Sequence, residues 1–234
     1  MSDVWGAILR DAVAGKPAAE IVERDDGYVV AFDAAYLVAP FAKWDDPVEK
    51  QAMRFVRGRV LDVGCGGGRV SLHLQDRGHD VVAIDASPGA VEVCRERGIR
   101  DARVLDLDDV DESLGRFDTI VMLGQNFGLF RTPARAARIL RRWSRIAEPR
   151  ARIVAETFDP YVRPEHRPYR ERNRARGRRE GALRVRVRYH ELATSWFDHL
   201  QVSQDELRAI VAGTEWRVER TLGDGPSYVA ILAR

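Results

Sequence analysis

The segment from Val60 to Arg69, VLDVGCGGGR, limits the possible folds of this 234-residue chain more than any other part of it. Its apolar beginning is typical of the end of a buried strand, and a helical pattern starts at Val70, directly after the glycine-rich stretch. Glycines let the main chain bend tightly and let a ligand approach where a Cβ would collide. The helix N-terminus then offers free N–H groups and a partial positive charge to an anionic group. This order of strand, glycine turn and helix predicts a nucleotide-binding corner.

The spacing of the glycines indicates which nucleotide this corner binds. A dinucleotide-binding turn follows the pattern G-x-G-x-x-G or G-x-G-x-x-A. Counting from Gly64 puts Arg69 at the third small position, where a long side chain would obstruct the close packing of strand and helix. A dinucleotide-dependent oxidoreductase is therefore disfavoured. Counting from Asp62 gives D-x-G-x-G-x-G instead, with Gly64, Gly66 and Gly68.

The pattern that starts at Asp62 resembles the first motif of the class I S-adenosylmethionine (SAM) methyltransferases, and later motifs agree with that family in their order. A second apolar run ends at Asp85, 23 residues beyond Asp62, and a third ends at Asp106. Two more apolar runs follow at 117–123 and 151–156. The resemblance covers roughly residues 50–160 and 200–234. Taken singly, each carboxylate could instead be a strand-end residue that faces solvent.

The resemblance implies that SAM is the cofactor. An acidic side chain at the tip of the second strand can accept hydrogen bonds from both ribose hydroxyls, which is the role implied for Asp85. Asp106 would face the adenine amino group, and residues 124–127 would line the floor under the methyl group. We expect Arg69 either to pair with the methionine carboxylate or to lie at the surface. The expected cofactor-binding residues are Asp62, Gly64, Cys65, Gly66, Gly68, Arg69, Asp85, Ala86, Asp106, Leu107 and Leu123.

The order of the elements predicts the fold class. From 58 to 160, strands alternate with helices, which is the pattern of a parallel sheet with right-handed crossovers. Together with the resemblance, this predicts an α/β, Rossmann-like fold with a seven-stranded, mostly parallel sheet, an antiparallel closing strand pair and three α/β/α layers. We expect four segments: an N-terminal cap (1–57), a SAM-binding core (58–160), an arginine-rich insertion with an extra strand (161–199), and a closing helix and strand pair (200–234).

Local signals place elements in the first and last of these segments. The cap is expected to be helical, with a helix over Val4–Val13, a hairpin turn at 25–27 and a helix capped by Asp46 with Glu49 at its third position. Ser203 and Glu206 form the capping-box pattern that opens the closing helix.

Composition limits the setting in which the protein works. The formal net charge of +2 does not require a polyanionic partner. Two cysteines, Cys65 and Cys94, have neither metal-ligand spacing nor a disulfide framework, so no metal is expected. No apolar stretch approaches the ~20 residues of a membrane span, and the N-terminus lacks the layout of a signal peptide. We therefore expect a cytoplasmic protein that does not associate with membranes.

Methyl transfer from a sulfonium needs few catalytic side chains. The leaving group is already good, so the protein mainly aligns the acceptor and excludes water. A general base is needed only when the acceptor arrives protonated, and a histidine can fill that role. The catalytic residue is not fixed by the sequence. Candidates near the expected mouth of the site are Asn126, Glu156, His190 and His199, together with Asp159 and Tyr189.

Absent motifs narrow the acceptor. Residues 123–126 read Leu-Gly-Gln-Asn and not the Asn/Asp-Pro-Pro-aromatic signature of enzymes that methylate amino groups in nucleic acids. The nucleophilic cysteine of a pyrimidine C5 methylase and the acidic loop of protein arginine methyltransferases are also missing. The sequence thus favours a small-molecule acceptor that is methylated on oxygen or nitrogen, and nucleic acid is not the expected partner.

The segment Arg163–Arg188 leaves an alternative open, because it holds eleven arginines against three glutamates. These arginines could contact phosphates in an RNA-binding or RNA-modifying protein. They could equally belong to a flap over the acceptor site, or reflect codon usage in an exposed insertion. Near its end, apolar residues from Leu183 to Tyr189 alternate with arginines, a pattern that predicts a half-exposed strand with its apolar face inward.

Overall fold

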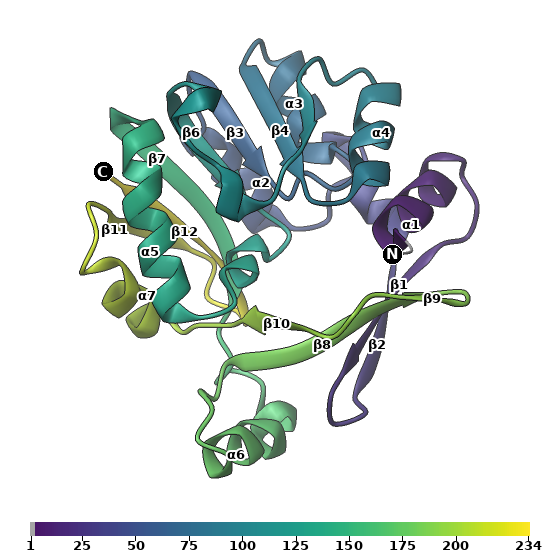
Figure 1. The fold of residues 1–234 in the computed structure, drawn as a ribbon, viewed down its shortest axis with the longest axis vertical. Coiled ribbons are helices and arrows are strands. Elements are labelled where there is room, and N and C mark those ends of the chain that lie inside the picture. Colours follow the sequence, from purple (N-terminus) through teal and green to yellow (C-terminus); the bar gives the residue numbers. More distant parts are fainter. Residues whose placement is uncertain (1–2) are drawn as a thin grey trace.

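The computed structural model describes residues 3–234, and its larger sheet has seven strands in the order β11-β12-β7-β6-β3-β4-β5 (Figure 1). The five strands from β7 to β5 are parallel, and β12 and β11 close the sheet in antiparallel fashion. This confirms the predicted fold. The strands are β3 (Arg59–Val63), β4 (Asp80–Asp85), β5 (Ala102–Val104), β6 (Phe117–Met122), β7 (Ala147–Phe158), β11 (Arg217–Leu222) and β12 (Ser227–Ala233).

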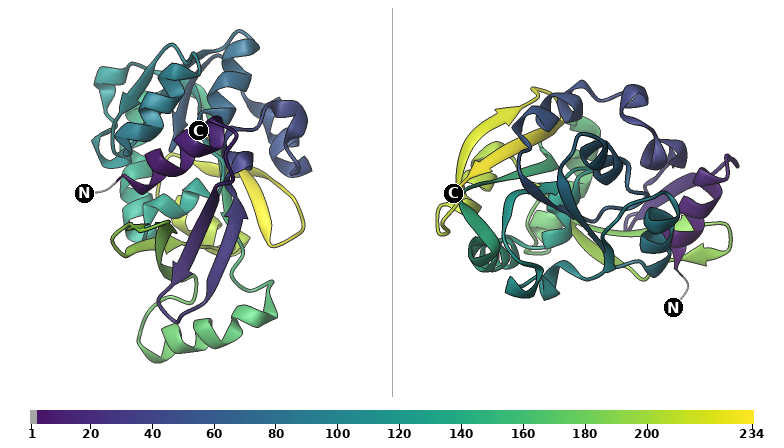
Figure 2. Two further views of the ribbon diagram at one scale, coloured as in Figure 1. Left: turned by 90° about the vertical axis from the view of Figure 1, so that its right-hand side faces the viewer. Right: turned by 90° about the horizontal axis from the view of Figure 1, so that it is seen from above.

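Helices cover both faces of this sheet and give the three predicted layers (Figures 1 and 2). Because consecutive strand residues point to opposite faces, Ile120 packs with Trp143 of α5 while Val121 packs with Leu74 of α3. A strand buried on both faces is mostly apolar, as the second half of β6 from Ile120 to Met122 is. The helices are α2 (Pro47–Ala52), α3 (Arg69–Asp76) and α4 (Pro88–Glu96) on one face, and α5 (Pro133–Trp143) and α7 (Gln204–Val211) on the other.

A second, antiparallel sheet lies below the carboxyl ends of the parallel strands (Figure 1). Its strand order is β10-β8-β1-β2, and β9 pairs with β8. The strands are β1 (Ala19–Arg24), β2 (Val29–Asp33), β8 (Ala182–Tyr189), β9 (Leu192–Ala193) and β10 (Phe197–Leu200). The sheet thus joins the hairpin of the expected cap to the expected arginine-rich insertion. The predicted hairpin turn at 25–27 is confirmed, since β1 and β2 pair across it. What is wrong is the expectation of a helical cap over 1–57, because the hairpin belongs to this sheet, where it gains β8 as a third strand.

Two helices flank the second sheet. At one end, α1 (Val4–Val13) packs against α4, and the Asp3 carboxylate accepts hydrogen bonds from Ser87 Oγ (2.7 Å) and the Gly89 amide (2.6 Å). At the other end, α6 (Arg167–Ala175) covers the β1–β2 turn through the Tyr169 hydroxyl, which donates to Asp25 (2.7 Å). The short 3-10 helices are Ala34–Val38 (η1), Phe41–Lys43, Met53–Phe55, Leu107–Asp109 (η4), Glu112–Leu114, Asn126–Phe130 (η6), Ser144–Ile146 and Pro164–His166 (η8).

The alternation in β8 has the predicted effect. Val185, Val187 and Tyr189 are buried, and the arginines between them point to the opposite face. There Arg186 forms a two-point ion pair with Glu23 of β1 (2.9 and 3.0 Å). Within residues 3–234, none of the helices combines the length and apolar character that a membrane span requires.

Candidate active site

A cavity of about 1020 Å³ separates the carboxyl edge of the large sheet from the second sheet. Its upper wall is the glycine turn and the ends of β4, β6 and β7, and its lower wall includes Val22, Val185 and Val187. Ligands of open α/β sheets bind outside the carboxyl ends of the strands. Sites for one drug-sized ligand occupy roughly 300–1,000 Å³, so this cavity is large enough for an adenosine cofactor with space beside it.

The glycine turn forms the part of the wall where the main chain itself is accessible. Gly66 has a φ of +52°, and a Cβ added to it would meet no atom within 4 Å. A ligand can therefore lie against the main chain at this point. Gly68, also predicted to bind the cofactor, lies outside the cavity lining, with Ile99 and Cys94 packed against it. The other ten predicted cofactor residues all line the cavity.

Asp85 stands at the end of β4, as the sequence predicts. Its two carboxylate oxygens accept hydrogen bonds from the Gly66 and Ser87 amides, each at 2.9 Å. Burial raises its pKa. Each oxygen keeps a lone pair for a further donor, so the side chain is suited to hold a ribose hydroxyl. Asp62 accepts from Ser71 Oγ (2.6 Å), and burial raises its pKa to about 6.

The expected adenine end is less enclosed. Asp106 accepts from the Asp108 amide (2.9 Å) at the start of η4, and one of its oxygens lies 3.9 Å from the Arg135 guanidinium. Leu107 beside it is buried and offers an apolar surface. The Cys65 thiol lies 3.6 Å from that of Cys94, and this contact together with burial raises the pKa of Cys65 well above its usual value.

Arg69 is buried, so the expectation of a surface position is wrong. Its guanidinium forms a two-point ion pair with Glu49 of α2, one contact measuring 2.8 Å, and lies 4.4 Å from the Trp44 ring. Only 10% of the Arg69 side chain and 7% of the Glu49 side chain are exposed. The expected capping role of Glu49 is also wrong, because its carboxylate turns to Arg69 while Asp46 alone caps α2. No local pattern connects residues so far apart in sequence.

Glu156 and Asn126 fix the loop after β6. Glu156 accepts from the Gly124 and Gln125 amides (2.7 and 3.2 Å) and from Ser227 Oγ (2.6 Å), and burial raises its pKa to about 7. These bonds hold Gln125 in a left-handed conformation with φ +64°, which is unfavourable for a residue with a Cβ. Asn126 donates to the Val63 and Gly64 carbonyls, each at 2.9 Å. Both side chains therefore position the floor of the cavity.

The two candidate histidines lie in different surroundings. His199 of β10 lines the cavity, and its ring lies so close to Gly128 of η6 that a Cβ there would collide with it. Burial lowers the pKa of His199 to about 4, although a hydrogen bond to the Gln125 main chain acts in the opposite direction. His190 lies in the exposed turn between β8 and β9, outside the cavity lining.

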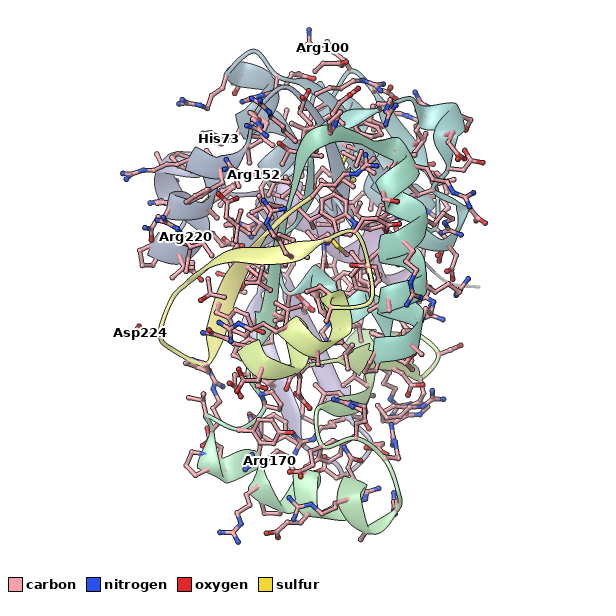
Figure 3. The ribbon with its side chains drawn as sticks, turned by 90° about the vertical axis from the view of Figure 1, so that its left-hand side faces the viewer. His73, Arg100, Arg152, Arg170, Arg220 and Asp224 are labelled. Atoms are coloured by element: carbon pink, nitrogen blue, oxygen red, sulfur yellow. The ribbon has the colours of Figure 1, made fainter. Side chains whose placement is uncertain are left out.

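Two further predicted candidates are also separated. Asp159 lines the cavity, whereas the Tyr189 hydroxyl donates to Asp11 of α1 (2.8 Å) and lies outside the lining. His73 of α3, a third histidine, stacks on Phe41 and lies outside the cavity lining (Figure 3). No sequence pattern pointed to four further lining residues, which lie on β1, η8 and α6 and come together only through long-range pairing. These residues are Glu20, Arg24, His166 and Tyr169.

Comparisons with known proteins agree with this geometry. A family model described as a methyltransferase domain matches residues 60–150. The 2-heptyl-1-hydroxyquinolin-4(1H)-one methyltransferase of Mycobacteroides abscessus is 39% identical over 72 residues, 28% of this chain and 32% of that protein. The ubiquinone biosynthesis O-methyltransferase of Xanthomonas oryzae pv. oryzae is 35% identical over 107 residues, 43% of each chain. The chain thus spans less than half the length of these curated relatives.

A solved structure matches nearly the whole chain. The SAM-dependent methyltransferase from Bacteroides fragilis, in complex with S-adenosyl-L-homocysteine, has a TM-score of 0.82 and 26% identity over 98% of this chain and 94% of that one. The fold and the cavity at the glycine turn define an α/β protein of the nucleotide-cofactor-binding type. More narrowly, the methyltransferase-domain match over 60–150 and the likeness to a SAM-dependent methyltransferase over nearly the whole chain support the class I SAM-dependent methyltransferase family.

Proposed function

We propose that this protein transfers a methyl group from SAM to an oxygen or nitrogen of a small-molecule acceptor bound above the second sheet. The observation that supports this most is the single cavity that ten predicted cofactor residues share with the apolar face of β1 and β8. SAM, when bound, supplies an electrophilic methyl group on a sulfonium. Asp85, Asp106 and the accessible main chain at Gly66 are suited to hold its adenosine part.

The contribution of the chain's own residues is mainly positional. Glu156 and Asn126 hold the loop at 124–126, the floor on which the family resemblance puts the methyl group. Valines from β1 and β8 form an apolar wall opposite this floor. Such a wall excludes water and orients the acceptor, which are the main requirements of an in-line displacement.

His199 is the candidate histidine positioned to accept a proton from the acceptor. Burial lowers its pKa to about 4, so the imidazole is neutral near pH 7 but is also a weak base, which limits its contribution to proton transfer. It lines the cavity beside the loop at 124–126, where an acceptor atom has to lie. Asp159, directly after β7, is a second candidate that lines the cavity.

The relatives favour a small aromatic or quinone-like acceptor over a nucleic acid, because one is named for a hydroxyquinolinone and another for ubiquinone biosynthesis. The arginine-rich segment agrees with this choice. Phosphate binding needs a coherent face of available cations, but most arginines of this segment pair with carboxylates. The pairs are Arg167–Glu171, Arg172–Asp25, Arg174–Glu180, Arg178–Asp198, Arg179–Glu206, Arg184–Asp198, Arg186–Glu23 and Arg188–Glu23. A cytoplasmic location stays a prediction.

Calorimetric titration tests the cofactor assignment, and a methylation screen tests the acceptor class. SAM and S-adenosylhomocysteine should bind, while NAD(P) should not. A library of small phenols, quinols and amines, assayed for S-adenosylhomocysteine release, should contain a substrate, and RNA should not be methylated. Binding of NAD(P) without binding of SAM would refute the proposal.

A further inference from the structure

Glu20 of β1 is a buried carboxylate for which residues 3–234 provide no cation. The residue is 8% exposed and lines the cavity. One oxygen accepts a hydrogen bond from the Tyr36 hydroxyl (2.9 Å), and the other has no donor in the described part of the chain. Removing a carboxylate from water without pairing it is unfavourable, and burial accordingly raises the pKa of Glu20.

Other buried carboxylates around the cavity are better satisfied. Glu49 pairs with Arg69, Asp85 accepts two main-chain amides, and Glu156 accepts three donors. Asp62 also keeps one oxygen without a donor, but the Arg69 charge acts on it. Glu20 therefore differs from the other buried lining carboxylates in having both an oxygen left for a ligand and no cation that acts on it. On the same strand, Glu23 points to the opposite face and pairs with Arg186 and Arg188.

Tyr36 links Glu20 to the methionine end of the expected cofactor site. Tyr36 belongs to η1, and the next residue, Leu37, presses its carbonyl against Gly67, where an added Cβ would lie 2.8 Å away. The Tyr36 hydroxyl is close enough to Glu20, Glu49 and Arg69 for all three charges to shift its pKa. A buried cation and an uncompensated carboxylate therefore lie at one end of the cavity.

We infer that Glu20 binds the ammonium group of the amino-acid end of the cofactor. This inference rests on the proposed function, since it needs SAM in the cavity. An amino-acid zwitterion carries its ammonium and carboxylate on one carbon. Its ammonium complements the free oxygen of Glu20, and its carboxylate can accept from the N–H donors of Arg69 that the pair with Glu49 leaves unused. The ammonium has three N–H donors, and one of them satisfies the free oxygen of Glu20. A residue of the second sheet would thereby hold the cofactor against the first.

Titration calorimetry with two ligands separates this role from a structural one. The ligands are S-adenosylhomocysteine, which keeps the amino-acid end and transfers no methyl group, and its analogue without the amino group. Glu20→Gln keeps the shape and can still accept from Tyr36, but it removes the charge. Because hydrogen bonds to charged groups are the stronger class, we expect roughly 10- to 100-fold weaker binding of S-adenosylhomocysteine and unchanged binding of the analogue. Glu23→Gln, which removes the same charge on the other face, should leave both affinities unchanged.

Equal affinity of wild type and Glu20→Gln for S-adenosylhomocysteine would overturn the inference, and so would an equal loss for both ligands. If Glu20→Gln does not fold, Tyr36→Phe removes the hydrogen bond that orients Glu20 and should weaken only S-adenosylhomocysteine; no effect on either ligand would again overturn it. A wild-type protein that binds neither ligand would instead contradict the proposed function.

Discussion

The two sheets of this protein are built from different kinds of contact. The central strands of the large sheet are buried on both faces, and its glycine turn is a single strand-turn-helix unit of about twenty residues. The second sheet joins β1 to β8, where Glu23 pairs with Arg186 across 163 positions of sequence. Only one of its faces lines the cavity, and the other carries ion pairs. We infer a division in which the large sheet binds the cofactor and the second sheet mainly shapes the acceptor site.

The largest effect should come from removing α6. We expect replacement of residues 165–180 by a short Gly-Ser linker to abolish methyl transfer, by roughly 100-fold or more, while binding of S-adenosylhomocysteine persists. The reason is that Tyr169 and Arg172 hold the β1–β2 turn, and misplacing a site wall by about 1 Å can cost that much. Turnover of the screened acceptor and calorimetry measure the two properties.

A control distinguishes the structural role of α6 from the charge of its exposed arginines. Arg167→Gln and Arg174→Gln keep α6 but remove exposed cations. Figure 3 shows where this helix lies: Arg170 of α6 is at one end of the molecule, and Arg100 is at the other. Both variants should keep full turnover. Retained turnover in the variant that lacks residues 165–180 would contradict the proposal that the second sheet shapes the acceptor site.

A second test concerns the residue that accepts a proton from the acceptor. Replacing His199 by glutamine should lower the rate of methyl transfer by roughly 10²-fold, the low end of the usual contribution of a general base because its lowered pKa makes it a weak one, and should leave S-adenosylhomocysteine binding unchanged. His190→Gln is the matched control, because His190 lies outside the cavity lining. Equal rates for the two variants would remove His199 from the mechanism.

A smaller effect is expected at the cofactor wall. Asp85→Ala should weaken SAM binding by roughly 1.5–3 kcal/mol, because hydrogen bonds from the ribose to a charged group are lost. Asp80→Ala, at the other end of the same strand, removes an exposed ion pair with Arg59 and should change little. Calorimetry that finds SAM affinity unchanged in Asp85→Ala would contradict the assignment of the large sheet.

The last test concerns a pH dependence of stability, which changes activity least. The pKa of Glu156 is raised from 4.5 to about 7, so the folded state holds this proton more tightly than the unfolded chain. Its contribution to stability is therefore full at low pH and decreases between about pH 4.5 and 7, by up to roughly 1 kcal/mol per pH unit. In urea unfolding at pH 5, 6 and 7, Glu156→Gln should lose less stability than wild type. The control Glu191→Gln, at an exposed position, should show the same pH dependence as the wild type. If the free energy of unfolding changes with pH equally in all three proteins, the raised pKa of Glu156 is refuted.

The large sheet could be predicted because its signals are local. The glycine turn, the carboxylates at 62, 85 and 106, and the caps Ser87, Thr132 and Ser203 each act on residues a few positions away. The same holds for the hairpin at 25–27 and the helix over Val4–Val13. Gly68 shows the limit of motif reasoning, because its position in the pattern is right but its surroundings are Ile99 and Cys94, not the cavity.

The sequence by itself therefore determined the α/β class, the cofactor type and the strand ends where the cofactor site lies, since strand periodicity and turn chemistry act over short distances. Only the tertiary structure decided that the cap hairpin and the arginine-rich segment share one sheet, that Arg69 pairs with Glu49, and that Glu20 faces the cavity without a cation. These features depend on strand register and on charge pairs between distant segments. Register is fixed by which faces can be buried together, and that is settled only when the whole chain has folded.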